Sequence, residues 1–244
     1  MEHSETVVLG LLMALGVGGP APEREDSWVQ VPAGVARYQL PAASAPVVES
    51  VAAFSIMHRQ VSRAEYTACV RAKRCAALDK PGRKRADQPV VGISWVDATA
   101  YASWLSAVTG ETYRLPRYGE WLQAVGHLYV DDPPIKDDPR NPARRWLEEY
   151  ERDAQRSAPS LKVQRFSEQA SSPSGLVSIA TNMWEWTNTC FSAGAGGQDF
   201  CGIHIAAGRH PSALSDFIRD PISGACSVGT PPTYVGLRLV REPR

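Results

Sequence analysis

The chain has 244 residues, of which 43% are hydrophobic and 21% are charged. These proportions are typical of a globular protein with one large domain or two small ones. Lys and Arg together number 26, and so do Asp and Glu, so the formal net charge is zero. The chain therefore lacks the excess positive charge that binds nucleic acid or anionic membranes, and we expect neither as a partner.

The first 22 residues read as a hydrophobic leader. An apolar run, "VVLGLLMALGV" from Val7 to Val17, has the length of a signal-peptide core and is too short to span a bilayer. Gly16 and Gly18 stand at a spacing suited to cleavage, although the preceding "MEHSET" lacks the usual positive charge. Export to the periplasm or beyond is the expectation. The alternatives are an N-terminal helix packed on the domain, or a start codon assigned too early.

Short strands and two capped helices follow the leader. The stretches Trp28–Gly34 and Val47–Ile56 resemble strands that end at turn residues. Ser62, with a glutamate three residues later, predicts a capping box and a helix start. Ser94, followed by an aspartate at the same spacing, predicts a second helix that Gly110 ends.

A third helix is expected soon after Pro116, and a charged insert follows it. Residues 127–173 are rich in proline and charge, with an amphipathic helix expected over 143–156. The apolar side of that helix comprises Trp146, Leu147 and Tyr150. Its many charges indicate a solvated face, and a partner-docking surface is the sharper alternative. Because no linker divides the rest, we expect one α+β domain over 27–244, with much irregular structure and a closing strand "YVGLRLVR".

The five cysteines fall into two close pairs and one single residue. Cys69 and Cys75 close a short loop, and Cys190 and Cys201 close a longer one. In an exported protein these pairs predict two disulfides, each stabilising the fold by roughly 2–3 kcal/mol. In a cytosolic protein they would be buried thiols. Cys226 remains, as a free thiol, as a rearranged partner of Cys201, or as a reactive group. No zinc-type cysteine spacing occurs.

Several motifs resemble one family. In order along the chain they are "WVQVPAG", "VSRAEY", "PVVGISWVDATAYASWLSAVTGETYRLPRYGEWLQAV", "TNMWEWT" and "VGLRLVR". These segments resemble the formylglycine-generating-enzyme, or sulfatase-modifying-factor, domain family, over about Trp28–Arg241 apart from the insert. The resemblance implies a single compact domain with C-type-lectin-like topology.

The resemblance also implies a calcium site at "TNMWEWT". In the family, this segment binds calcium through a side-chain oxygen, two backbone carbonyls and the glutamate. The corresponding residues here are Ser178, Thr181, Met183 and Glu185. The site is weakened, because a serine hydroxyl stands where the family has Asn or Asp and is a poorer calcium ligand. The alternative is that Trp184 and Trp186 fill the core while Glu185 accepts hydrogen bonds from backbone amides.

The copper chemistry of the family is not supported by this sequence. The family's oxidases oxidise a substrate cysteine with oxygen, using copper(I) held by two thiolates five residues apart. The equivalent positions are about Ser212 and Phe217, and neither is a thiol. His204 and His210 flank this segment, but such histidines are more often surface or core residues than ligands. The iron motif of ergothioneine-pathway relatives, His-x3-His-x-Glu, is also missing from the sequence.

The expected function is therefore that of an accessory protein. We expect an exported domain that binds a protein or peptide, assists maturation of an envelope enzyme, lacks the formylglycine-generating reaction and has no assigned catalytic residue. The insert "RRWLEEYERDAQR" resembles that of nitrite-reductase-linked accessory members. The alternative is an oxygen-dependent metal oxidase, of the formylglycine-generating or pyoverdine-maturation type, with a rearranged site. A purely structural envelope protein is the third reading.

Overall fold

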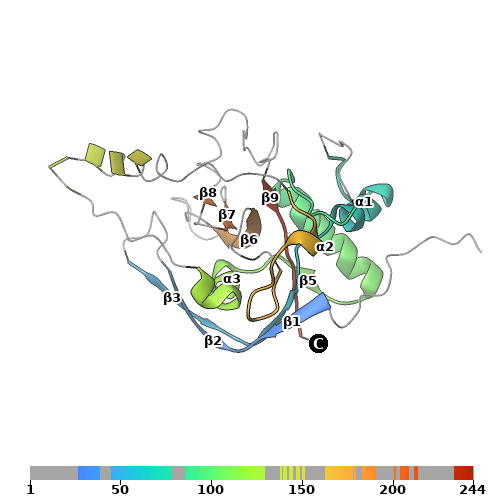
Figure 1. Cartoon of the computed structure of the whole chain (residues 1–244), viewed down its shortest axis with the longest axis horizontal. Coiled ribbons are helices and arrows are strands. Elements are labelled where there is room, and N and C mark those ends of the chain that lie inside the picture. The colour runs from blue at the N-terminus through green and yellow to red at the C-terminus, as the bar shows by residue number, and fades with distance from the viewer. Residues whose placement is uncertain are drawn as a thin grey trace, which may run out of the picture.

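Three small sheets and three α-helices make up the described part of the chain (Figure 1). The computed structural model describes residues 27–38, 45–78, 86–129, 138, 140–141, 143–144, 147–148, 150–151, 163–177, 179, 183–190, 201, 204–208, 212–213 and 234–243. The leader, Ser178, Thr181, Phe217 and Cys226 lie outside these residues. No helix in the described part is long and apolar enough to cross a membrane.

The first sheet joins the two ends of the domain. Its order is β1 (Trp28–Val31), β4 (Phe54–Met57), β10 (Val240–Arg241) and β5 (Tyr113–Arg114), and all its pairings are antiparallel. The last strand of the chain thus lies between β4 and β5. The sheet therefore joins segments that are almost the full length of the domain apart in sequence.

The second sheet is the two-stranded ribbon of β2 (Gly34–Tyr38) and β3 (Val47–Val51). In Figure 1 this curved ribbon runs below α3 (Tyr118–Val125). The approach is close at Gly119, where a Cβ would stand 2.2 Å from a carboxylate oxygen of Glu49, so a larger residue would require that side chain to move.

The third sheet, at the centre of Figure 1, carries the "WEW" motif. Its order is β8 (Ser212–Ala213), β7 (His204–Ala207), β6 (Trp184–Cys190) and β9 (Val235–Gly236). β6 pairs antiparallel with β7 and parallel with β9. The pairing of β6 with β7 shifts register between Trp186 and Cys190, which separates the buried start of β6 from its more exposed end.

Both predicted capping boxes are confirmed. Ser62 and Glu65 begin α1 (Arg63–Arg71), and Ser94 and Asp97 begin α2 (Trp95–Thr109). Gly110 ends α2 in the left-handed conformation, with φ of 77°, as expected for a glycine cap. Two short 3-10 helices also occur, Gly126–Leu128 and Phe166–Glu168.

Two predicted strands are wrong in extent. The stretch Val47–Ile56 forms β3 and β4, which belong to different sheets. The closing "YVGLRLVR" is likewise divided between β9 and β10, and Leu237, Arg238 and Leu239 between them are all fully buried. An alternating pattern suggests a strand with one face exposed to solvent. This segment instead crosses from one sheet to another, and the side chains on both of its faces are buried.

The core comprises two clusters of buried residues, one around α2 and one around α3. Trp186 belongs to the first cluster with Tyr101 and Leu105, and Trp121 belongs to the second with Tyr118 and Ile205. The mixture of few helices, short strands and long irregular connections confirms the predicted α+β class.

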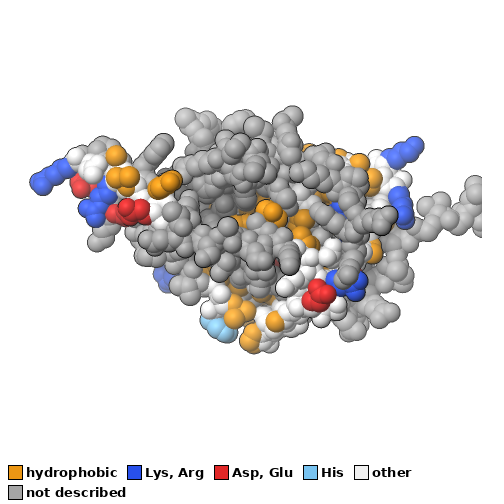
Figure 2. Space-filling view, turned by 45° about the horizontal axis from the view of Figure 1, so that its top comes forward, with side chains coloured by type: hydrophobic (Ala, Val, Ile, Leu, Met, Phe, Trp, Pro, Cys, Tyr) orange, Lys and Arg blue, Asp and Glu red, His pale blue; other side chains and the backbone are white. Residues whose placement is uncertain are grey.

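The insert projects from this body. Residues 143–144, 147–148 and 150–151 have helical backbone. Its described side chains form the left end of Figure 2, where basic and acidic groups alternate with hydrophobic ones. Leu147 is 56% exposed and Tyr150 is 72% exposed, so these apolar residues do not pack on the domain.

Candidate functional site

Strand β6 carries two distinct groups of functional side chains. Glu185, near its start, is buried in the protein, and Cys190, at its end, lies in a half-buried disulfide. The surroundings of the two groups differ in charge and exposure.

The Glu185 carboxylate is fully enclosed, with 1% of the residue exposed. Arg238, which is 0% exposed, donates from Nε to Oε2 at 3.0 Å and from Nη2 to Oε1 at 3.0 Å. Gln60 Nε2 donates to Oε1 at 2.9 Å, and Trp121 Nε1 donates to Oε2 at 3.2 Å. Each carboxylate oxygen therefore accepts two hydrogen bonds from side chains.

Arg238 is equally well satisfied. Its Nη1 donates to the carbonyl oxygens of Met57 at 2.8 Å and His58 at 2.9 Å, and its Nη2 also donates to Val177 at 2.8 Å. With the two bonds to Glu185, all five N–H groups of the guanidinium have an acceptor. A buried ion pair is stable only when its remaining polar atoms are satisfied in this way. This pair ties β6 to the turn after β4 and to the chain that joins β9 to β10.

These contacts do not fit a calcium ligand at Glu185. Calcium requires six to eight oxygen atoms, whereas both oxygens of this carboxylate are occupied and its charge is balanced by Arg238. Gln60 Oε1 is a buried oxygen that has no hydrogen-bond partner among the described residues, but one amide oxygen is far short of a coordination shell. Met183 is buried, and Ser178 and Thr181 lie outside the described residues. Calcium binding stays a prediction that the contacts of Glu185 disfavour.

The structure contains both predicted disulfides. Cys69 joins Cys75 with a Cα–Cα distance of 5.4 Å, and Cys190 joins Cys201 at 5.6 Å. Cys69 is fully buried in the core around α2 and its partner Cys75 is half-buried, whereas Cys190 and Cys201 are both half-buried. The second bridge therefore has two partly exposed residues, and the first bridge has one.

His204, which the sequence analysis weighed as a metal ligand and favoured as a surface or core residue, lies beside the second disulfide. Its Nδ1 is 3.7 Å from Sγ of Cys201. The imidazole stacks on the indole of Trp95, with ring centroids 3.8 Å apart and planes inclined by 6°. Burial lowers the pKa of His204 to about 4, so the ring is neutral at neutral pH. In the sequence, the only hint was the short spacing from Cys201 to His204.

The lowered pKa predicts a pH dependence of stability. The pKa of His204 is about 4 in the folded chain and 6.5 in the unfolded chain, so the folded chain binds this proton less readily. Its contribution to stability is therefore complete when the pH is above the pKa of the unfolded chain. The contribution is lost as the pH falls toward the pKa of the folded chain. Between pH 7 and pH 5 we expect a loss of about 2 kcal/mol in the free energy of unfolding from this group.

Urea unfolding of the unmodified chain and of His204→Asn at both pH values measures that loss. The asparagine variant should lose about 2 kcal/mol less than the unmodified chain. The pKa of His58 is also lowered, by burial and by Arg238 and Arg59, but both chains share this group. Equal losses in the two chains would show that His204 titrates normally.

A match over most of the chain identifies the family. The family model for the sulfatase-modifying factor enzyme 1-like domain matches residues 16–243. The chain belongs to the FGE-sulfatase family. Among proteins with curated functions, none matches this family member.

Solved structures share the fold of this family member. PvdO from Pseudomonas aeruginosa is 17% identical, with a TM-score of 0.57 over 88% of this chain and 94% of that one. Treponema denticola variable protein 1 is 15% identical, with a TM-score of 0.53 over 88% and 95%. CarF is 19% identical, with a TM-score of 0.51 over 89% and 98%. At these identities the likeness shows a single domain of the FGE type and nothing about substrate.

Ser212, which the sequence resemblance puts near one copper position of the family, lies in β8 at the edge of the third sheet. It pairs with Ala206 of β7, which in turn pairs with Trp186 of β6. Phe217, near the other expected position, and His210 lie outside the described residues. Where the chain is described, no three His, Cys, Asp or Glu side chains are grouped so that they could hold a metal ion.

Proposed function

We propose that the protein is an exported accessory or binding protein, built on the FGE-type domain, that does not carry out the formylglycine-generating oxidation. One observation carries the proposal: four of the five cysteines are consumed in disulfides. Cys226 is the one cysteine of the sequence that these two bridges leave over. Copper(I) in this family needs two thiolates together, so the oxidised chain cannot supply the pair.

The residues at the copper positions support the same conclusion. A hydroxyl at Ser212 is a hard, weakly basic ligand, and a phenyl ring at Phe217 has no donor atom at all. Cys226 lies nine residues beyond Phe217, not five residues from another cysteine. Rearrangement of the site would therefore require a disulfide to open first.

Export is supported by the disulfides and by the leader. Structural disulfides persist in the periplasm and outside the cell, and are rare where thiols are kept reduced. Cys69–Cys75 and Cys190–Cys201 are what such a compartment produces. In that compartment we propose that the protein assists the maturation of an envelope enzyme through a protein or peptide contact.

The insert supplies the surface that we propose for this contact. Leu147 and Tyr150 are three residues apart and strongly exposed, so they lie on one side of the helix. On the same helix, Arg144 Nε lies 2.8 Å from a carboxylate oxygen of Glu148. Apolar anchors within a rim of charged side chains are typical of protein-binding helices.

Substitutions on the insert test the proposed contact. The wild-type chain and the variants Leu147→Glu and Tyr150→Glu are used to capture proteins from an envelope extract of the source cells. We expect the partner that the wild type enriches to be reduced at least about tenfold with either variant, because a charge is placed in an apolar contact. Val48→Glu is the matched control, since Val48 is 57% exposed and lies on β3.

The test compares how much partner is captured by the insert variants and by the Val48→Glu control. A partner lost with Leu147→Glu and kept with Val48→Glu supports binding through the insert. A partner that all variants capture equally would contradict it, because the contact would then not involve the helix.

A further inference from the structure

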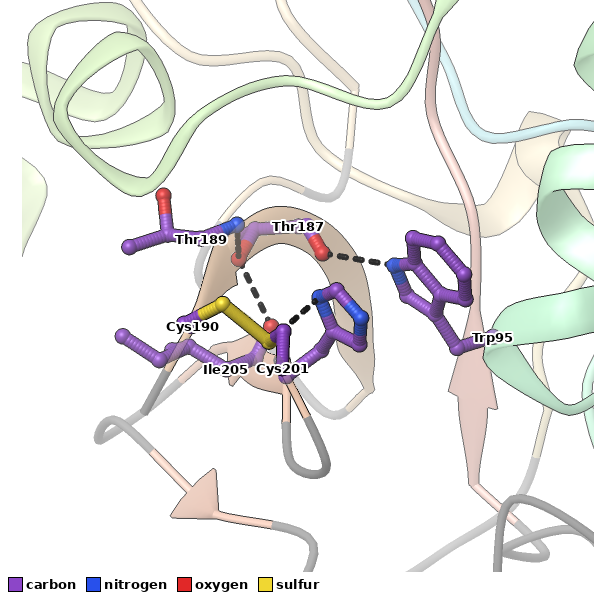
Figure 3. Close-up of a disulfide and its surroundings, with 7 residues drawn as sticks. Trp95, Thr187, Thr189, Cys190, Cys201 and Ile205 are labelled. Atoms are coloured by element: carbon purple, nitrogen blue, oxygen red, sulfur yellow. Dashed lines mark hydrogen bonds between the residues drawn. A yellow bond between two sulfur atoms is a disulfide. The ribbon is translucent and has the colours of Figure 1, made fainter. Parts of the chain in front are cut away.

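The Cys190–Cys201 disulfide has surroundings that a purely structural bridge does not need. Figure 3 shows the bridge beside Thr187 and Thr189 of β6, with Trp95 facing this strand from α2. Both sulfur-bearing residues are half-buried. An external thiol can therefore approach either sulfur here, whereas in the other bridge Cys69 is fully buried and only Cys75 is half-buried.

The imidazole next to this bridge is held in one orientation. His204 stacks on Trp95, whose Nε1 donates to the backbone oxygen of Thr187 at 3.1 Å. Thr187 Oγ1 in turn donates to the backbone oxygen of Ile205, the neighbour of His204, at 2.7 Å (Figure 3). These two hydrogen bonds tie the indole of Trp95 and the backbone next to His204 to β6. Nδ1 of His204 is thereby kept next to Sγ of Cys201.

The placement of Nδ1 distinguishes the two sulfur atoms. A disulfide sulfur has no hydrogen, so the contact with Cys201 is a hydrogen bond only when Nδ1 carries the proton. If the bridge opens, the sulfur that leaves as a thiolate is a stronger acceptor for this N–H. A thiol that leaves more easily makes exchange faster. The neutral imidazole of His204 stabilises the leaving thiolate as an N–H donor, without a positive charge.

We propose that Cys190–Cys201 is an exchange-active disulfide that oxidises thiols, with Cys190 as the attacked residue, Cys201 as the leaving one and His204 as the residue that stabilises it. An incoming thiolate attacks Sγ of Cys190 and forms a mixed disulfide, while the bond between the protein sulfurs breaks and its electron pair goes to Sγ of Cys201.

A second thiol–disulfide exchange completes the reaction and accounts for all electrons and protons. A second substrate thiolate attacks the substrate sulfur of the mixed disulfide and releases Cys190. Two substrate thiols become one substrate disulfide, losing two electrons, and the protein disulfide becomes two thiols that take up the two protons. The substrate class is a dithiol or a pair of cysteine thiols. The proposal does not depend on binding through the insert.

Trapping of the mixed disulfide tests the proposal on the full chain. The oxidised protein is mixed briefly with reduced glutathione, quenched with N-ethylmaleimide, digested and analysed by mass spectrometry. We expect glutathione on Cys190 and maleimide on Cys201, in at least about fivefold excess over the reverse pattern, because the stabilised sulfur leaves. The Cys69–Cys75 bridge is the internal control and should stay oxidised in the same digest.

Variants at position 204 separate the effect of the histidine on disulfide exchange from the effect of the exposure of the bridge. His204→Ala should slow the opening of Cys190–Cys201 about tenfold and equalise the two labelling patterns, since no donor then favours either sulfur. His204→Asn places an amide N–H close to the position of Nδ1 and should restore part of the preference. Equal labelling of Cys190 and Cys201 in the unmodified chain would overturn the proposal without any variant. So would an unchanged pattern in His204→Ala, or opening of Cys69–Cys75 at the same rate.

Discussion

Replacing Arg238 with methionine is expected to lower the free energy of unfolding by about 3–5 kcal/mol. The substitution removes the cation but leaves the carboxylate of Glu185 buried, with only Gln60 and Trp121 as donors. A buried charge without its partner keeps its desolvation penalty and loses the attraction that offset it. The backbone oxygens of Met57 and Val177 also lose their donor.

A more exposed pair in the same molecule provides the control. Arg59 donates to both carboxylate oxygens of Glu65, at 2.9 and 2.7 Å, with 30% of its side chain exposed. Arg59→Met should therefore lower stability by about 1 kcal/mol or less. Urea unfolding of Arg238→Met, Glu185→Gln, Arg238→Met/Glu185→Gln and Arg59→Met gives the comparison. The double variant should lose less than the sum of its single changes, because the pair is coupled. An Arg238→Met chain as stable as Arg59→Met would contradict the ion-pair interpretation.

The same variants address calcium. If Glu185 is committed to Arg238, the melting temperature should be the same in calcium and in a chelator. A higher melting temperature in calcium that disappears in Glu185→Gln would instead restore the carboxylate as a metal ligand.

Replacing Trp186 with alanine is expected to lower the free energy of unfolding by about 3–5 kcal/mol. Trp186 is 1% exposed in the core around α2, and its Nε1 donates to the backbone oxygen of Ile93 at 2.9 Å. The substitution leaves a large cavity and removes the donor to a buried carbonyl.

Trp184, two residues earlier in the same motif, is the matched control. It is half-buried and packs against Gly208, where a Cβ would stand 2.7 Å from Cδ1 of the indole. Part of the ring already contacts solvent, so Trp184→Ala should lower stability by about 1–2 kcal/mol. Urea unfolding measures both variants. Equal losses would mean that the two tryptophans of the "WEW" motif do not divide into a core residue and a peripheral one.

Local features of the fold could be predicted from the sequence, and contacts between distant segments could not. The capping boxes at Ser62 and Ser94 depend on a side chain three residues away, so the residue pattern contains them. The split of "YVGLRLVR" depends on which sheets already stand nearby. Periodicity reports a buried face, and it cannot show that Arg238 is buried with its neighbours.

The site divides in the same way. Trp186 was expected as a core residue, with Glu185 as a calcium ligand or an acceptor for backbone amides. The actual partner, Arg238, is 53 residues away, and sequence alone does not place it. The contact between His204 and Trp95 likewise joins β7 to the start of α2. In contrast, the pairing of Cys190 with Cys201 follows from a loop short enough to close.

Oxygen uptake by the oxidised chain, loaded with copper(I) and given a cysteine-containing peptide, tests the central claim most directly. The claim is that the FGE-type domain is retained while the pair of thiolates for copper(I) is not. We predict a rate no higher than that of the same copper and peptide without the protein. Protein-dependent uptake, with a tightly held copper ion and conversion of the peptide cysteine to formylglycine, would contradict the claim and establish the alternative of an oxidase with a rearranged site.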